Sequence, residues 1–295
     1  MDLELSDDQV ALRDGIAAML ASRVPMERVR AGFDRALFDD LAAAGVFSLR
    51  DDGFSWSDCV VVFEQLGRAC VPGPLVSSLM YGRGQRAGVL LDGWVEHLGE
   101  LDVVVIPDGG TVPASALVGE PAPWPLDPCT PVTRIDAVST VDAAEIDWTE
   151  WSRAGAVLTA ALQLGLADRL TELAVAYAME RQQFDRPIAA FQAIKHLCAD
   201  MLVRTEVARA AVYAAGAHLD AAATSPGADR AIAGAKVLAG EAAITNGKSA
   251  TQVHGGMGFT WEVDVHLYLK RAWVLDTHFG SSDEHADFVG TLSAR

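Results

Sequence analysis

Arg181 lies where a long apolar helix is expected to end, and Phe184 follows three positions later. An arginine in this place can pair with an anionic phosphate while an aromatic ring covers the face of an adenine, and an ADP moiety requires both contacts. The alternative interpretation is a surface arginine favoured by the helix dipole, followed by a phenylalanine of the core. The two residues alone leave both interpretations open.

A glycine cluster, Gly255-Gly256-Met257-Gly258, follows a second predicted helix. Glycine allows a ligand to approach backbone N–H groups closely. Gln252 lies three positions before the cluster. Its side chain could donate a hydrogen bond to a phosphate or ribose, or it could cap the preceding helix. Most clusters of this kind are simple turns. The segment is therefore a candidate ligand site only in combination with other motifs.

Three short helices are expected to form an N-terminal helical domain over residues 1–100. Ser6 begins a capping box for a helix over about 7–22, and apolar residues then recur at helical spacing. Further helices are predicted at 34–44 and 55–66, each ended by a glycine.

A shortened β middle domain is predicted over residues 101–147. Residues 101–106 form a short β-rich run, and 121–131 contain five prolines. Such a composition is typical of short strands and irregular loops.

Long helices dominate residues 148–295. Residues 157–179 are apolar nearly all round, as in a helix buried between others, and 194–219 are amphipathic. Ser225 and Pro226 provide the N-cap and first turn of a helix that continues to about residue 249. The sequence predicts a mainly α protein with a C-terminal four-helix bundle.

The composition excludes several classes of partner. A formal net charge of −17 opposes binding to nucleic acid or to an anionic membrane. No segment has the length and pattern of a membrane span or an export signal, so we expect a cytoplasmic protein. The four cysteines are scattered without a metal-binding pair, so no metal site and no disulfide is predicted.

The motifs, taken together and in order, resemble the acyl-CoA dehydrogenase family. The two segments of the opening paragraphs resemble its flavin-binding signatures, in the right order and at the right separation. The resemblance extends over nearly the whole chain, and its other matches are Asp8-Gln9 with Arg13, Glu64 to Arg68, Leu126-Asp127-Pro128, Leu164-Gly165-Leu166 and Thr260 to Ala272.

The resemblance implies FAD as cofactor and assigns residues to it. Arg181, Gln183 and Phe184 would hold the pyrophosphate and adenine, Gln192 would lie nearby, and Gln252, Gly255 and Gly256 would reach the same dinucleotide. In that family the two segments come from neighbouring subunits, so the resemblance also implies an oligomer. The family usually passes electrons to an electron-transfer flavoprotein.

The chain departs from the family at the catalytic base. The family reaction is an α,β-desaturation of a CoA thioester, in which a carboxylate removes the α-proton while a hydride leaves to the flavin. Phe279 stands at the usual glutamate position and Gly155 at the alternative one, so no catalytic residue is assigned. Asp276, Asp283, Glu284 and Glu262 are the nearby carboxylates. Glu262 matches a position that is acidic in catalytic members too and looks structural there, so the first three are the ones that could substitute.

The middle domain is a second departure, because it is shorter than the family's flavin-covering barrel and carries no clear counterpart of its motifs. Both departures fit the smaller subunit of a heterotetramer, like those of actinobacterial steroid catabolism, whose homologous partner supplies the base for a bulky CoA thioester. Two alternatives remain: a self-sufficient homo-oligomer that uses one of the three carboxylates, and a flavin-free pseudoenzyme scaffold.

Overall fold

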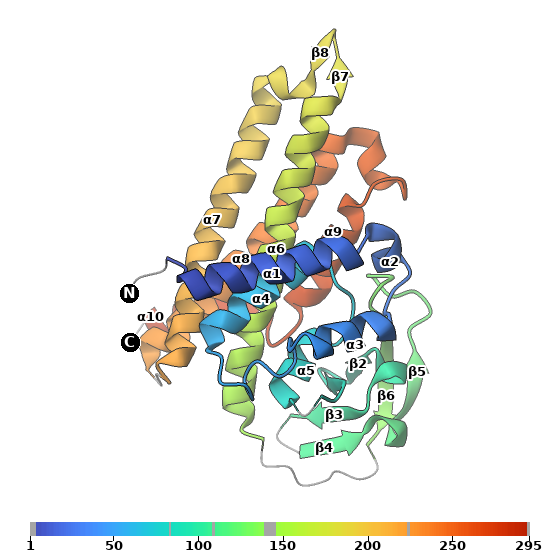
Figure 1. Cartoon of the computed structure of the whole chain (residues 1–295), viewed down its shortest axis with the longest axis vertical. Coiled ribbons are helices and arrows are strands. Elements are labelled where there is room, and N and C mark those ends of the chain that lie inside the picture. Colours follow the sequence, from blue (N-terminus) through green and yellow to red (C-terminus); the bar gives the residue numbers. More distant parts are fainter. Residues whose placement is uncertain (1–3, 83, 108–109, 139–145, 223–224, 294–295) are drawn as a thin grey trace.

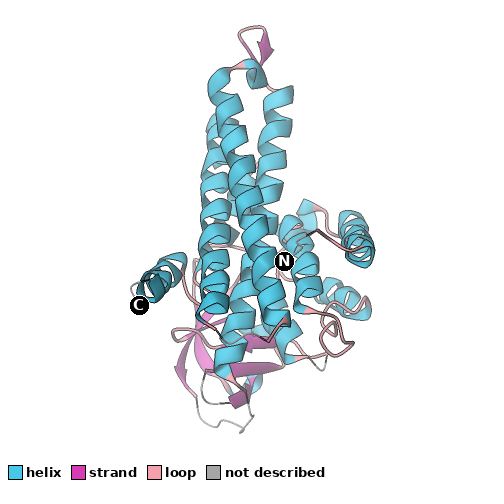
Figure 2. Cartoon of the chain, turned by 90° about the vertical axis from the view of Figure 1, so that its left-hand side faces the viewer, coloured by secondary structure: helices cyan, strands magenta, loops and turns pink. Residues whose placement is uncertain are grey.

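The computed structural model describes residues 4–82, 84–107, 110–138, 146–222 and 225–293. Within these ranges the protein is mainly α, as predicted, with ten α-helices and three small sheets. The long helices lie side by side in one elongated bundle, the N-terminal helices pack against one side of it, and the two larger sheets lie at one end (Figures 1 and 2).

Five helices form the N-terminal part: α1 (Asp7–Arg23), α2 (Met26–Arg30), α3 (Arg35–Ala43), α4 (Trp56–Arg68) and α5 (Leu75–Tyr81). Ser6 and Ser55 both begin their helices with a capping box, which satisfies otherwise unpaired N–H groups of the first turn. Helix α4 was expected to stop at Gly67 but continues through Arg68. Gly67 instead permits close contact between two helices.

Helix α4 crosses the bundle helix α6 (Trp148–Glu180) at two glycines. A Cβ atom at Gly67 would overlap the carbonyl oxygen of Leu162, and one at Gly165 would overlap that of Glu64. Only residues without a side chain allow two helix backbones to approach so closely. This crossing fixes the N-terminal helices onto the bundle and thereby positions the cavity described below.

Two three-stranded sheets form the middle part. Their strands are β1 (Ala87–Val89), β2 (Trp94–Glu96), β3 (Val103–Ile106), β4 (Gly110–Pro113), β5 (Val118–Pro121) and β6 (Val132–Ala137). One sheet has the order β1-β3-β4 with β1 parallel to β3, and the other has the antiparallel order β2-β6-β5. Strands β1 and β2 precede residue 101, where the β domain was expected to begin, because each pairs with a strand from beyond that position.

The bundle contains α6, α7 (Gln192–Asp220), α8 (Pro226–His254) and α9 (Val265–Asp276), and α10 (Ser282–Ser293) packs beside α8. A two-stranded hairpin of β7 (Gln182–Gln183) and β8 (Arg186–Pro187) joins α6 to α7. This hairpin forms the tip of the molecule opposite the larger sheets (Figure 1). No helix within the described ranges combines the length and the apolar character that crossing a membrane requires.

A buried asparagine joins three of the bundle helices. The Nδ2 of Asn246 on α8 donates to the carbonyl oxygens of Ala167 on α6 and Met201 on α7, at 3.3 and 3.1 Å. Its Oδ1 accepts a hydrogen bond from Nε of Arg204 at 2.9 Å. Because a buried amide is stable only with its partners in place, this network fixes the register of the three helices.

Candidate functional site

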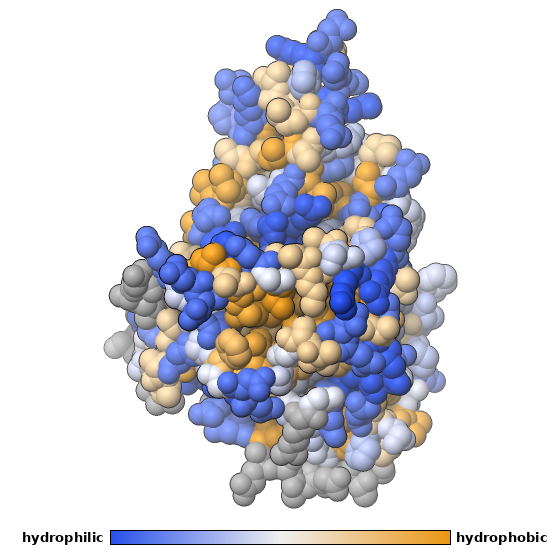
Figure 3. Space-filling model, in the orientation of Figure 1, coloured by the Kyte–Doolittle hydropathy of each residue, from blue (hydrophilic) through white to orange (hydrophobic). Residues whose placement is uncertain are grey.

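The hairpin at the tip of the bundle presents the first group of predicted site residues. Arg181 is the C-cap of α6, and Phe184 and Asp185 occupy the turn with φ values of 54° and 60°. Phe184 is 86% exposed, so the interpretation as a core phenylalanine is wrong. Arg181, Gln183 and Gln192 are exposed as well. Figure 3 shows that hydrophilic residues dominate this tip.

Two residues that the sequence analysis did not select shape the same tip. The ring of Phe191 lies edge-on to that of Phe184, with 6.0 Å between centroids. The guanidinium of Arg186 lies over the ring of Phe191, 4.3 Å from its centroid. These contacts hold an exposed aromatic and a cation together, an arrangement suited to stacking against a planar base. The pairing of β7 with β8 creates this arrangement of rings and cation. The spacing of the residues in the sequence gives no signal for it.

The second predicted segment lies at the same end of the bundle. Tyr177, one helical turn before Arg181, stacks on His254 with 4.1 Å between ring centroids. Gly255 follows with a φ of 60° and nothing within 4 Å of a Cβ built on it, so its backbone is open to a ligand. Gln252 and Gly256 are also exposed. All seven predicted cofactor-binding residues therefore lie on an open surface at one end of the bundle.

The two positions where the family resemblance places a catalytic base are in direct contact. A Cβ atom added to Gly155 would lie 2.5 Å from Cδ1 of Phe279, so a side chain there would have to displace this ring. Trp148 and Trp151 pack against the same ring, with centroid distances of 6.3 and 6.2 Å. Phe279 is 8% exposed. An apolar aromatic cluster thus occupies both base positions.

The substitute carboxylates have structural partners or point to solvent. Oδ1 of Asp276 accepts a hydrogen bond from Oγ of Ser282 at 2.5 Å. Glu284 accepts hydrogen bonds from the backbone N–H and the hydroxyl of Ser281, which lower its pKa. Asp283 is exposed in the first turn of α10. None of these arrangements is a carboxylate held in a dry site, which removal of an α-proton requires.

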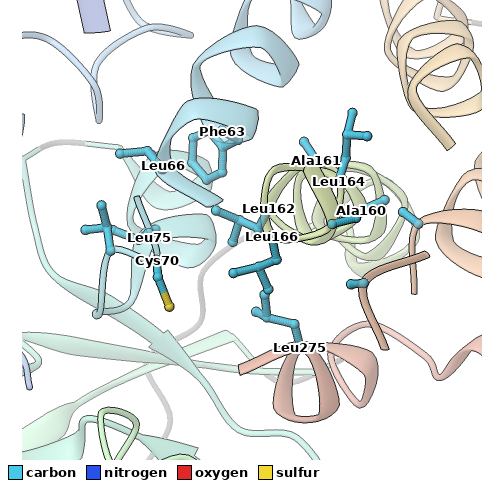
Figure 4. Packing of buried hydrophobic residues seen from close by; sticks show 14 of the residues in the cluster. Phe63, Leu66, Cys70, Leu75, Ala160, Ala161, Leu162, Leu164, Leu166 and Leu275 are labelled. Carbon is cyan, nitrogen blue, oxygen red and sulfur yellow. The ribbon is translucent and has the colours of Figure 1, made fainter. Parts of the chain in front are cut away.

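A cavity of about 470 Å³ lies between the N-terminal helices, the sheets and the bundle. Most of its lining side chains are apolar, and they include Leu66, Leu75, Leu162, Leu166, Val274 and Leu275. Figure 4 shows Leu162 and Leu166 of α6 facing Leu75 and Cys70 of the N-terminal part. Phe279 closes one side and also lines a second cavity of about 460 Å³ between α6, α8 and α10.

One wall of the 470 Å³ cavity carries an acid–base pair. Nε2 of His278, after α9, lies 2.8 Å from Oε1 of Glu96 at the end of β2. Burial raises the pKa of Glu96, but His278, together with His97 and Arg271, more than offsets this effect, and the net pKa is lowered. Glu96 is therefore ionised at neutral pH.

A buried ion pair lies next to that wall. Nε of Arg271, which also lines the cavity, pairs with Oδ2 of Asp127, and Nη1 donates to the carbonyl oxygen of Val71 at 3.0 Å. Asp127 also accepts a hydrogen bond from the hydroxyl of Thr130 at 2.7 Å. The pair ties the loop after β5 to α9. The sequence analysis included both residues only as parts of matching segments.

The comparisons with known proteins agree with this fold. Residues 152–291 match the acyl-CoA dehydrogenase C-terminal domain. The ChsE4–ChsE5 complex from Mycobacterium tuberculosis contains a chain that superposes with a TM-score of 0.85 at 21% identity, covering 100% of this chain and 99% of that one. A Tcur3481–Tcur3483 steroid ACAD variant gives a TM-score of 0.83 at 20% identity, covering 98% of each chain.

A curated relative is similar in sequence over nearly its full length. The acyl-CoA dehydrogenase IpdE2 of Mycobacterium tuberculosis (strain ATCC 25618 / H37Rv) is 32% identical over 299 residues, which cover 90% of this chain and 91% of the relative. Similarity of this extent includes the N-terminal helices and the sheets as well as the bundle. The chain belongs to the acyl-CoA dehydrogenase family.

Proposed function

We propose that this chain is the base-deficient subunit of a heteromeric, FAD-dependent acyl-CoA dehydrogenase that desaturates a bulky CoA thioester. The contact between Phe279 and Gly155 carries the proposal. It leaves the chain without a proton acceptor at either family position, so a homologous partner that retains the glutamate supplies the base.

The exposed tip fits the nucleotide end of FAD. Arg181 places a guanidinium at a helix terminus, the open backbone at Gly255 lies at the same end, and the exposed ring of Phe184 can cover an adenine. FAD, when bound, supplies the acceptor for the hydride that leaves the β-carbon. In this proposal the chain's own residues bind and orient the dinucleotide, and the partner's residues handle the proton.

The similar proteins support the heteromeric arrangement. ChsE4–ChsE5 is a complex of two different proteins, and the Tcur3481–Tcur3483 structure is described as a steroid ACAD. By analogy we propose a steroid-derived acyl group for this chain, a heterotetramer in the cytoplasm, and an electron-transfer flavoprotein as electron acceptor.

The decisive experiment expresses this chain alone and together with a homologous chain that carries the glutamate, with a purification tag on this chain only. We expect flavin absorbance in the mixed complex and none in the single chain. Turnover of an acyl-CoA by the single chain would contradict the proposal and favour a self-sufficient enzyme. A colourless mixed complex that takes up no added FAD would instead favour the flavin-free scaffold.

A substitution at Arg181 tests whether residues of this chain bind the FAD of the mixed complex. Arg181→Ala in the mixed complex should weaken FAD binding by roughly 10- to 100-fold, because a charge-assisted contact to phosphate is lost. Arg134→Ala, an exposed arginine on β6, is the matched control and should leave FAD binding unchanged. Equal FAD affinity in both variants would exclude Arg181 from the site.

A further inference from the structure

A glutamine inside the bundle has no hydrogen-bond partner in the part of the chain that the structure describes. Gln163 lies on α6 and is 0% exposed. Neither Nε2 nor Oε1 of its amide has a partner among the described residues. Interchanging the nitrogen and the oxygen would not provide one, because both atoms lack partners. A buried amide without hydrogen bonds is destabilising, so a group that satisfies both atoms is expected at this place.

The amide of Gln163 faces two further polar side chains across α8. A Cβ atom built on Gly240 would overlap Oγ of Ser282 and would lie 2.6 Å from Oδ1 of Asp276. Nε2 of Gln163 lies 3.4 Å from the same point. The separation of Nε2 of Gln163 and Oδ1 of Asp276 is therefore no greater than these two distances together, which is about the span of one bridging water molecule. Because Gly240 adds no side chain at this point, the polar atoms converge there.

The neighbouring groups add polarity but no net charge. Thr159, one turn before Gln163 on the same face of α6, is 0% exposed, and its hydroxyl also has no partner among the described residues. Lys236 precedes Gly240 by one turn of α8, and its Nζ lies 3.7 Å from Oδ1 of Asp276. These two charges balance each other. An entering ion would find no charge left to compensate its own.

The two amide atoms also determine the chemistry of the ligand. Nε2 of Gln163 needs an acceptor, and Oε1 needs a donor. A metal cation could serve only the oxygen, and an anion could serve only the nitrogen. Water both donates and accepts, and buried water molecules typically make about three hydrogen bonds to groups that otherwise lack partners.

From these observations we infer that a water molecule binds between α6, α8 and the turn 276–282, where it joins the amide of Gln163 to Asp276 and Ser282. Asp276 ends α9 and Ser282 begins α10, so the bound water fixes both ends of the turn that carries Phe279. The site lies within this chain and requires neither flavin nor a catalytic base. It goes beyond the proposed desaturation and can be tested independently of it.

A crystal structure of the complex in which the chain purifies, at a resolution that shows ordered water molecules, tests the site directly. We expect one water molecule within hydrogen-bonding distance of the Gln163 amide and of either Oγ of Ser282 or Oδ1 of Asp276. An amide that contacts only protein atoms, or that has no polar neighbour at all, overturns the inference.

Unfolding of the full chain in urea tests the bridge by a double-mutant cycle. Gln163→Met keeps the length of the side chain but removes its hydrogen bonds, so the unfolding midpoint should fall. Ser282→Ala should lower the midpoint as well, and the double variant should lose less than the two single losses together, because both residues bind the same water. In a dry site Gln163→Met would raise the midpoint, since it removes a buried amide without partners. Such a rise, or additive losses, overturns the bridge.

Ser281→Ala is the matched control in the same turn. The hydroxyl of Ser281 donates to the carboxylate of Glu284 at 2.8 Å, whereas that of Ser282 donates to Asp276. Combined with Gln163→Met, the control substitution should give additive losses. Equal coupling of Gln163 to both serines would show a general loosening of the turn in place of a shared water, and it would overturn the inference.

Discussion

The ring of Phe279 lies against Gly155, so the two positions at which the family resemblance places a base form one contact. A Cβ atom on Gly155 would be 2.5 Å from both Cδ1 and Cε1 of this ring. The backbone of Phe279 has a φ of 53°, and Nε2 of His285 donates to its carbonyl oxygen at 2.9 Å. The ring of Phe279 thus fills the space that a side chain at position 155 would occupy.

Gly155→Ala should destabilise the protein by about 1–3 kcal/mol, because its methyl group is forced into the ring of Phe279. Phe279→Ala should cost about 3–5 kcal/mol through the cavity it leaves. The double variant should be more stable than the sum of the two effects, since the methyl group then enters the emptied space. Urea unfolding of all four proteins measures this coupling. Strict additivity would show that the two residues do not interact.

Gly165→Ala should destabilise the contact between α4 and α6 more than an ordinary substitution, because its Cβ would overlap the carbonyl oxygen of Glu64. We expect the free energy of unfolding to fall by at least about 3 kcal/mol, which is the upper end of the usual cost of overpacking a core. Gly234→Ala is the matched control in α8, where nothing lies within 4 Å of the new Cβ, and it should stabilise by about 0.5–1 kcal/mol. The unfolding midpoints in urea should therefore shift in opposite directions. A shift in the same direction would contradict the close crossing.

Local chemistry made the helices predictable from the sequence. Ser6 and Ser55 form their capping bonds with residues three positions away, so the sequence contains all the partners. The continuation of α4 through Gly67 was missed because the reason lies on α6, at Leu162. A glycine that ends a helix and one that admits a neighbouring backbone look alike in sequence.

The family resemblance identified Phe279 and Gly155 separately, but their contact requires the fold, because 124 positions separate the two residues in the sequence. The pair of Glu96 and His278 was missed for the same reason, since they are 182 positions apart. Neither residue type is unusual in its local segment. Only the packing of β2 against the end of α9 turns them into a polar wall.

Asp127→Asn should destabilise the protein by about 3–5 kcal/mol at pH 7, because it leaves the guanidinium of Arg271 buried without its counter-charge. Asp136→Asn, exposed on β6, is the control and should change stability by less than about 0.5 kcal/mol.

The difference in stability between wild type and Asp127→Asn also depends on pH. Burial raises the pKa of Asp127, but Arg271 and Thr130 more than offset this, and the net pKa lies below 3.8. The stabilisation is therefore full above about pH 4 and is lost as pH falls through the lowered pKa. A difference that stays constant down to pH 3 would contradict this ion pair.

Lys236→Met tests a buried charge on α8 that contacts the end of α9. The side chain of Lys236 is 0% exposed, and Nζ donates to the carbonyl oxygens of Leu275 and Asp276 at 3.3 and 2.9 Å. Burial lowers the pKa of this amine to about 8, an effect that Asp276 offsets only in part.

The unfolded chain binds this proton more tightly than the folded one, so wild type should gain stability relative to Lys236→Met between pH 8 and 10.5. The gain should approach about 3 kcal/mol. Buried thiols such as Cys59, whose pKa is raised to about 12, lower the stability of both proteins above pH 9 and cancel in the difference. Urea unfolding at steps of half a pH unit measures this difference. Lys195→Met, on the exposed face of α7, is the control for the loss of a lysine that is not buried. A difference between wild type and Lys236→Met that does not change with pH would show that burial does not lower the pKa of Lys236.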